Sequence, residues 1–356
     1  MKLDKLIFYA VAPATLLALV VFTAFDSLLA LLNEVDEIGI GSYDFLRVVE
    51  YIALTVPRRA YQYFSTATVV GVTLGLGLLA ARSELIALQA AGASRLRIGA
   101  SVMLALLPLL VLALFLGEWL GPRGDRMAND LAAQSKSQGI AFSGSGLWLR
   151  DGLAVWNARR ALTPAEGPLE LWELWRYQFD IDARLVEVIR AEHARFEPGR
   201  WTLHKLSRDH LTPEAVRSET LDELVVESLL DPALVASHTL RPRQQGTADL
   251  AETIRYAKVN RLDSLSFESA YWYRLCYPLL VLALAFAATP FAFGSLRSGG
   301  TGKRLMLGMS LGVGFFFLHR TLINLAETER SGLLLVNLGP ILLLFLWGVW
   351  RLRRVE

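Results

Sequence analysis

Long apolar runs separated by short polar stretches dominate both ends of the chain. Six runs reach the roughly 20 residues that a helix needs to cross a hydrocarbon core of about 30 Å. They cover residues 6–32, 56–81, 98–120, 269–293, 305–325 and 333–350. The first run is too long for a cleaved signal peptide, and no small-residue cleavage site follows it. The pattern therefore predicts six transmembrane helices.

The segment between the third and fourth runs, residues 121–268, has a different pattern of apolar and polar residues. Short stretches rich in branched and aromatic residues alternate with polar positions, which is typical of strands. These stretches lie at 147–149, 153–156, 171–175, 186–189 and 219–230, and a hairpin is expected from 192–195 into 200–203 around Pro198-Gly199. Asp151-Gly152 and Pro198-Gly199 supply turns between them. About 140 residues of this kind without long helices predict one antiparallel sandwich or jelly roll.

The expected fold class is therefore an α-helical membrane protein with an inserted antiparallel β-jellyroll domain. Helical periodicity returns at 249–262, where Leu250, Ile254 and Ala257 share one stripe. The expected domains are residues 1–124 with transmembrane helices 1–3, 125–247 with the β domain, 248–268 with a connecting helix, and 269–356 with transmembrane helices 4–6.

The distribution of charge predicts the orientation of these helices. Basic residues precede the first run, separate the second from the third and the fourth from the fifth, and follow the sixth. They are Lys2, Lys5, Arg82, Arg95, Arg97, Arg297, Lys303, Arg304, Arg351, Arg353 and Arg354. The alternate connections are acidic. Because cytoplasmic loops carry the excess of Lys and Arg, both termini are expected in the cytoplasm and the β domain beyond the membrane.

A polar island at residues 80–99 separates the second and third apolar runs. Ser83 is expected to cap a short helix that begins at Glu84, where a negative side chain suits the helix dipole. Gly92 offers a stop for that helix, and Ser94 is expected to cap the next one. The island thus predicts about two turns of helix at a membrane surface.

One face of this short helix carries Leu85, Leu88 and Gln89 at neighbouring spacing. A partner that presses on such a helix would also move the two spanning helices joined to it. An ordinary cytoplasmic loop is the alternative interpretation.

Catalytic patterns are absent from the sequence. No GxxxxGK[ST] phosphate-binding loop occurs, so the chain is not expected to hydrolyse ATP. Its five histidines show no metal-ligand spacing, and its one cysteine, Cys276, cannot form an intramolecular disulfide. Gly71, Gly75 and Gly77 form a small-residue face for close helix packing.

Two ionisable residues, His319 and Arg320, lie well along the fifth apolar run. Ionisable groups at such depth usually face a polar cavity or pair with a partner. A substrate-facing role and simple snorkelling to the outer interface both remain open for them.

The overall pattern and several segments resemble the LptF/LptG permeases of the lipopolysaccharide exporter. The sequences of these segments are most similar to those of the LptG members. The similar segments are GSYDFL at 41–46, TVPRR at 55–59, LGLGLLAARSELIALQAAGASRLRI at 74–98, GEWLGPRGDRMA at 117–128 and FGSLRS at 293–298. The resemblance covers essentially the whole chain and is most specific around the polar island.

The resemblance implies a permease subunit of the inner membrane, pairing with LptF in a heterodimer on two copies of the ATPase LptB. Lipopolysaccharide would enter between the two permeases, through gates formed by the first and fifth spans. It would leave through β-jellyrolls that include LptC and the LptA bridge. ATP and Mg²⁺ would be bound by the ATPase, so no cofactor is expected in this chain, and no nucleic acid partner is expected. The residues that match the ATPase-coupling helix are Ser83, Glu84, Leu85, Leu88, Gln89, Gly92 and Arg95.

The sequence departs from the family at the outer end of the first span. Members often carry lysines there that meet the lipid's phosphates, whereas this chain has Asn33-Glu34-Val35-Asp36-Glu37. Either the phosphate contacts have moved or divalent cations bridge them. The candidate substrate-cavity residues are Asn33, Arg58, Arg59, Arg123, Arg126, His319 and Arg320.

Two other classes of protein fit parts of the pattern. A mechanotransmission protein would couple a cytoplasmic ATPase to a partner beyond the membrane, but such proteins usually have four spans. A membrane enzyme that modifies envelope lipids would need clustered carboxylates or histidines, which are dispersed here.

If the β domain is a lipid conduit, its inward side chains must contact acyl chains. Photo-crosslinkers at alternate positions of 147–156 and 171–179 should then label lipopolysaccharide with a period of two. Absence of labelling at every position during turnover would identify the domain as a scaffold for other β domains.

Overall fold

The computed structural model describes most of the chain. Its described residues are 2–39, 42–135, 140–141, 147–162, 170–197, 200–212, 214–227, 242–260, 262–293, 301–329 and 332–354. The expected turn at Pro198-Gly199, Arg297 and most of the 293–298 motif lie outside this part of the chain.

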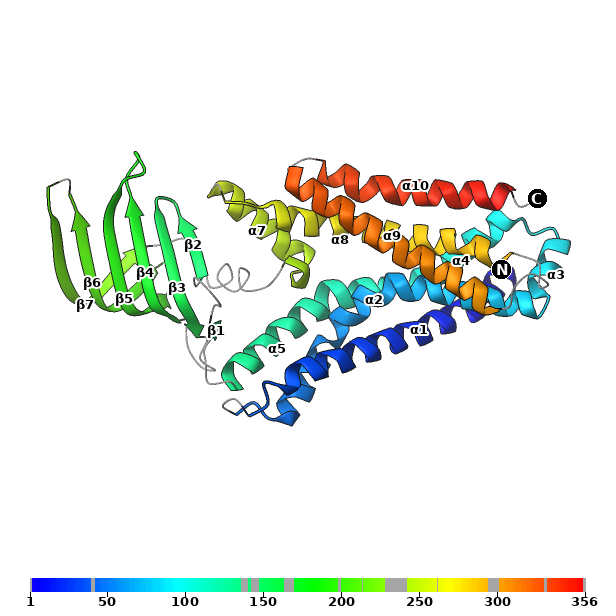
Figure 1. Ribbon diagram of the computed structural model, residues 1–356, viewed down its shortest axis with the longest axis horizontal. Helices are drawn as coiled ribbons and strands as arrows, with labels where there is room; N and C mark the ends of the chain where they lie inside the picture. Colours follow the sequence, from blue (N-terminus) through cyan, green and yellow to red (C-terminus); the bar gives the residue numbers. More distant parts are fainter. Residues whose placement is uncertain are drawn as a thin grey trace.

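Six long helices in the described residues are apolar enough to cross a membrane, as predicted. They are α1 (Lys2–Val35), α2 (Phe45–Ala81), α4 (Arg95–Phe115), α8 (Leu265–Ala288), α9 (Thr301–Glu329) and α10 (Leu333–Arg354). The bundle occupies one end of the molecule and the β domain the other, while both chain termini and the short helix α3 (Glu84–Ala90) lie at the end far from the sheet (Figure 1).

The third span does not stop where the sequence suggested. After α4 it continues through a π-helical turn (Leu116–Leu120) into α5 (Gly121–Ser135), past the expected boundary at residue 124. Helix α5 stays helical because it packs on α2: a Cβ at Gly124 would lie 2.1 Å from the Leu54 carbonyl oxygen. Gly117 likewise lets the π turn approach the ring of Tyr61. A π turn inside a helix often marks a functional position.

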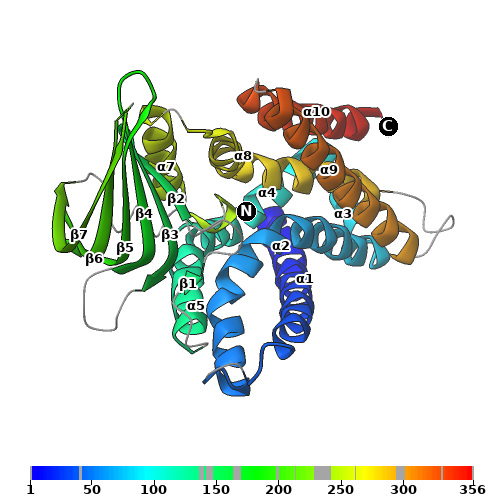
Figure 2. The ribbon, with the colours of Figure 1, turned by 60° about the vertical axis from the view of Figure 1, so that its left-hand side comes forward.

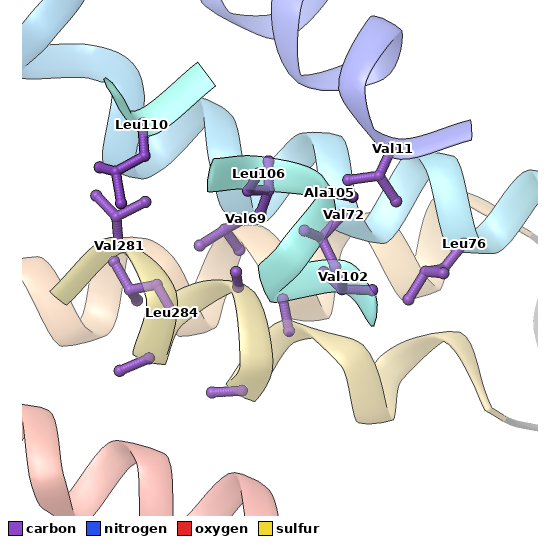
Figure 3. Packing of buried hydrophobic residues seen from close by; sticks show 14 of the residues in the cluster. Val11, Val69, Val72, Leu76, Val102, Ala105, Leu106, Leu110, Val281 and Leu284 are labelled. Atoms are coloured by element: carbon purple, nitrogen blue, oxygen red, sulfur yellow. The ribbon is translucent and has the colours of Figure 1, made fainter. Parts of the chain in front are cut away.

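Helix α2 and helix α8 form the centre of the bundle, whereas α1, α9 and α10 leave most of their apolar surface exposed. Branched side chains of α1, α2, α4 and α8 interdigitate along the centre (Figure 3). Helix α1 approaches α2 closely because α2 lacks side chains at Gly71 and Gly75. A Cβ at Gly75 would lie 2.6 Å from the Ala10 carbonyl oxygen, and one at Gly71 would lie 2.1 Å from Thr15 Oγ1. The small-residue face is confirmed at these two positions.

The β domain is one antiparallel sheet in the described residues. Its strands are β1 (Ile140–Ala141), β2 (Leu147–Asp151), β3 (Ala154–Leu162), β4 (Glu170–Phe179), β5 (Leu185–Glu197), β6 (Arg200–Leu211) and β7 (Val216–Glu227). The order is β1-β3-β4-β5-β6-β7, and β2 also pairs with β3. The expected hairpin is confirmed, since Glu197 pairs with Arg200. The antiparallel β domain is confirmed, but its core belongs to one sheet and not to two packed sheets of a sandwich; jelly-roll closure stays a prediction.

One face of the sheet carries the core of the domain. Trp156 and Trp201 are almost fully buried there, with ring centroids 6.2 Å apart. Tyr256 of α7 (Thr247–Val259) packs against this core, and its hydroxyl donates to the Arg150 carbonyl oxygen at 2.5 Å. Burial raises the pKa of Tyr256 to about 12, so the phenol keeps its donor proton at any physiological pH. Helix α7 is the predicted connecting helix, and it lies beside the sheet (Figure 2).

A line of irregular residues crosses the sheet from β3 to β7. The ladder skips Arg159, Glu173, Glu192, Lys205 and Asp222, while the pairs on either side of each are in register. Glu173 has φ +54° and Lys205 has φ +49°. Non-glycine residues rarely adopt this region, which costs of the order of 1–3 kcal/mol each. We call these five residues the bulge line for this local irregularity, although no strand gains an extra residue there and the register does not shift across them.

The bulge line reverses which face of β4, β5, β6 and β7 is buried. Leu171 and Leu174 of β4 both point into the core, as do Leu203 and Leu206 of β6. Burial in 171–179 therefore does not follow a strict period of two, because the left-handed residue at Glu173 rotates the strand beyond it. Labelling by lipopolysaccharide stays a prediction. Inward positions of β4 change from odd to even numbers across this residue.

The contact between α1 and α2 can be tested with Gly75→Ala. Its methyl group would meet the backbone of α1, which cannot yield, so we expect a loss of about 1–3 kcal/mol in stability. The measurement is the thermal midpoint of the purified chain in detergent. The matched control is Gly339→Ala in α10, where a Cβ meets nothing within 4 Å. Equal midpoints for the two variants would contradict the close contact.

Candidate functional site

The short helix α3 joins α2 to α4 by two tight turns. Ser83 adopts φ +62°, and its side chain makes no cap hydrogen bond, so the predicted side-chain cap is wrong. The chain reverses directly after α2, where the Ser83 amide donates to the Ala80 carbonyl at 3.0 Å, and this turn holds the hydroxyl away from the helix. The backbone of Ser83 still begins the helix, because its carbonyl oxygen accepts a hydrogen bond from the Ala87 amide at 3.0 Å.

The other end of α3 follows the prediction. Gly92 has φ +89°, its amide donates to the Gln89 carbonyl at 2.9 Å, and the Ala93 amide donates to the Leu88 carbonyl at 3.0 Å. This is the glycine-dependent Schellman ending of a helix. The predicted cap of α4 is also confirmed, since Ser94 Oγ accepts from the Arg97 amide at 3.2 Å. Arg95 in the first turn of α4 lies over the Phe293 ring at 5.5 Å.

The predicted apolar face of α3 points toward the rest of the chain. Leu85 is 2% exposed and belongs to the core of the helix bundle, while Leu88 and Gln89 are half-buried. The exposed apolar residue is Ile86, which sequence reasoning missed because it counted only the inward stripe. Glu84 is half-exposed at the start of the helix. Leu85 therefore anchors α3, while Glu84 and Ile86 remain accessible.

The two adjacent arginines of α2 are engaged by carboxylates. Arg58 Nε donates to Asp125 Oδ1 of α5 at 2.8 Å, and Asp125 is 1% exposed. Arg59 pairs with the Asp26 carboxylate of α1 and donates from Nε to Thr55 Oγ1 at 3.1 Å. These ion pairs tie α2 to its neighbours and occupy part of the donor capacity of both arginines. Their role as phosphate contacts stays a prediction.

The remaining cavity candidates are scattered over different elements. Arg126 pairs with Asp249 of α7 at 2.5 Å, and Arg123 lies over the Trp119 ring at 4.9 Å. His319 is 4% exposed and contacts two tilted aromatic rings, with the centroid of Tyr273 at 6.0 Å and that of Phe315 at 5.6 Å. Arg320 and Asn33 are exposed. Arg320 has no ion-pair partner in the described part of the chain, so it is the strongest remaining candidate for an anion.

A further charged junction lies where the bundle meets α7. Arg274 of α8 is 7% exposed and donates from Nη1 to Glu118 Oε1 at 2.7 Å and to the Gly117 carbonyl at 3.1 Å. The other carboxylate oxygen of Glu118 accepts from the Thr247 amide at 2.8 Å. Glu118 therefore holds the first residue of α7 against the π turn.

Sequence reasoning missed Asp26, Glu118, Asp125 and Arg274. Asp26 and Arg274 stand inside apolar runs, and charges at such depth are a recognisable signal of pairing or function. No local pattern indicates which partner each one meets, because the partners are distant in sequence.

Comparison with known proteins decides the family. The model of a family described as the lipopolysaccharide export system permease LptF/LptG matches residues 5–354. The chain belongs to this family. The lipopolysaccharide export system permease protein LptG of Escherichia coli K12 is 30% identical over 356 residues, covering 99% of this chain and 98% of that protein. The LptG protein of Haemophilus influenzae is 28% identical over 355 residues, with 99% and 98% covered.

Membership of the LptF/LptG family makes the chain a permease subunit of a lipopolysaccharide export system in a membrane. The six spans and the inserted antiparallel sheet agree with this assignment. The mechanotransmission alternative is thereby set aside, and so is the lipid-modifying enzyme.

The role of Arg58 can be tested through its partner. If the ion pair is structural, Asp125→Asn should destabilise the chain as much as Arg58→Gln, by about 3 kcal/mol, because each leaves a buried group unpaired. Thermal midpoints in detergent measure this, with Arg320→Gln as the exposed control. A normal midpoint for Arg58→Gln together with lost stimulation of the exporter by lipid would identify Arg58 as a phosphate contact instead.

Proposed function

We propose that this chain is the LptG-type half of the exporter, paired with LptF and driven by a separate LptB ATPase dimer that docks on α3. The main support for this proposal is the local structure of α3. It is anchored by a buried leucine, closed by a glycine-dependent turn and continuous with two spans, while Glu84 and Ile86 face outward. A push on α3 therefore moves α2 and α4 with it.

The proposed orientation places α3 and both termini in the cytoplasm and the β domain in the periplasm. Basic residues gather at the end of the bundle that carries α3, which supports this orientation through the positive-inside tendency. They include Lys2, Lys5, Arg82, Arg95, Arg97, Arg351, Arg353 and Arg354. The membrane would then be the inner membrane of a Gram-negative cell.

Helices α1 and α9 are proposed to border the entrance for lipopolysaccharide. Both expose large apolar side chains along the membrane, including Leu17, Val20 and Phe25 of α1 and Phe316 and Phe317 of α9. Such surfaces suit acyl chains or the facing helices of LptF. Arg320 stands beside the exposed phenylalanines of α9, where its charge can meet a lipid phosphate.

The proposed route of motion runs from the ATPase to the β domain through the third span. Helix α4 continues through the π turn, where the Glu118 carboxylate accepts hydrogen bonds from Arg274 and from the first amide of α7. Helix α7 in turn contacts β2 and its turn through Tyr256 and Asn260. Displacement of the π turn would thus move the sheet. We propose that the sheet transfers the lipid toward LptC and LptA. ATP and Mg²⁺ would be bound by LptB and no cofactor by this chain.

The docking of the ATPase can be tested on the outward side of α3. We expect Glu84→Lys and Ile86→Ser to reduce co-purification of LptB about tenfold, since each removes a contact worth about 1.4 kcal/mol. Membrane insertion and the thermal midpoint of the chain should stay normal. Leu85→Ala is the contrasting variant, because loss of a buried leucine should lower the midpoint by its cavity cost. Normal recovery of LptB with both outward variants would contradict docking on this face.

A further inference from the structure

The β domain has a hollow on the face of its sheet opposite the tryptophan core. The cavity has a volume of about 840 Å³, within the size range of small-molecule sites. It crosses β3 to β7 between two rows of side chains, and we call it the trough. Neither the helix bundle nor α7 contributes to its lining.

The bulge line accounts for the trough. All five bulge-line residues line the cavity, among them Glu173 and Lys205 with their left-handed backbones. Glycine would adopt these conformations without strain, yet both positions carry long charged side chains. Strained residues of this kind concentrate at functional sites, because the surrounding structure must offset their cost. The strain thus gathers where the sheet is hollowed.

The first wall of the trough consists of planar groups in parallel. The Tyr177 and Trp175 rings lie 6.2 Å apart at an interplanar angle of 10°, and the Trp148 ring continues the series 6.0 Å from Tyr177 at 14°. The Arg190 guanidinium lies 5.1 Å from the Trp175 centroid. Trp175 and Tyr177 lie on β4, with Arg190 of β5 at one end of the stack and Trp148 of β2 at the other, outside the lining itself. The stacked rings and the guanidinium thus form an aromatic wall at the edge of the cavity.

The second wall consists of paired charges. Glu173 accepts from Arg160 at 2.5 Å and from Arg159 at 3.4 Å, and Lys205 pairs with Glu192 at 3.0 Å. The hydrogen bond from Arg160 holds the pKa of Glu173 below its usual range, so this carboxylate stays ionised at neutral pH. Ser207 and Thr220 add hydroxyl groups to the lining. This wall thus offers donors and acceptors with nearly balanced charge.

These two walls select a class of ligand. A phosphate group alone would need cations without carboxylate partners, and an acyl chain would need an apolar lining. A saccharide has C–H faces that suit the negative face of aromatic rings, and hydroxyls that both donate to carboxylates and accept from arginine. We propose that the trough is a saccharide site, which takes the sugar portion of lipopolysaccharide while the lipid portion is moved elsewhere. The choice of this saccharide rests on the proposed export function.

Direct binding tests the site on the full chain in lipid nanodiscs. The probe is the oligosaccharide released from lipopolysaccharide by mild acid and then dephosphorylated, followed by saturation-transfer NMR and titration calorimetry. Trp175→Ala should weaken binding about tenfold or more. Ser207→Trp, which fills the trough without removing a wall, should do the same. Trp172→Ala is the matched control on the same strand, because Trp172 stacks on His193 and does not line the cavity.

Each outcome decides the proposal. Binding by the wild type that Trp175→Ala and Ser207→Trp weaken and Trp172→Ala leaves intact supports it. No binding by the wild type, or equal effects of Trp175→Ala and Trp172→Ala, overturns it. Equal affinity for maltoheptaose overturns the assignment to lipopolysaccharide, and capture of a peptide in place of sugar overturns the saccharide class.

Export by the assembled complex separates this proposal from the proposed function. In proteoliposomes, Trp175→Ala should slow release of sugar-bearing lipopolysaccharide but not of the same lipid stripped to lipid A. Equal slowing of both substrates would overturn the saccharide site while leaving the export function in place. If the wild-type complex releases neither substrate, both the export function and the lipopolysaccharide assignment fail.

Discussion

The structure depends on pairing of the charges that its helices carry into the membrane bundle. A buried arginine or carboxylate without a partner is strongly destabilising, so each one fixes the position of the helix that supplies its partner. Arg59 with Asp26 joins α2 to α1, Arg58 with Asp125 joins α2 to α5, and Arg274 with Glu118 joins α8 to the π turn. Three ion pairs therefore set the arrangement of five segments.

This arrangement explains why the β domain stands in a defined position. The domain follows α5 and precedes α7, and both helices are fastened to the bundle by members of the same set of charges. Arg126 and Asp249 add a direct link between the two helices. The sheet is thus held at both ends of its sequence, by α5 before it and by α7 after it.

The sequence allowed prediction of features that depend on local pattern. The six spans, the ending of α3 at Gly92 and the cap at Ser94 all follow from periodicity and from residue conformational preference. The antiparallel strands followed from alternation in the same way. Features that depend on distant partners were not accessible: the burial of Leu85 and the pairing of Arg58 require knowledge of the tertiary contacts.

The bulge line shows a second limit. Alternation predicted that β4 would keep one face inward, but Glu173 takes a left-handed backbone that its residue type does not favour. The interruption of pairing at this residue is shared by five neighbouring strands, β3 to β7. No window of a single strand contains that information.

Helix α2 has a geometry with mechanical consequences. Its 37 residues, with Pro57 among them, rise about 55 Å along the helix path, which is more than the hydrocarbon core needs. The glycines that admit α1 lie closer to the end of α2 that adjoins α3. Gly75 is about 9 Å from the end near α3, whereas Gly71 is about 39 Å from the opposite end at Phe45. Because Arg59 and Asp26 join α1 to α2 again on the other side of the glycines, a sideways step near α3 would move both helices together.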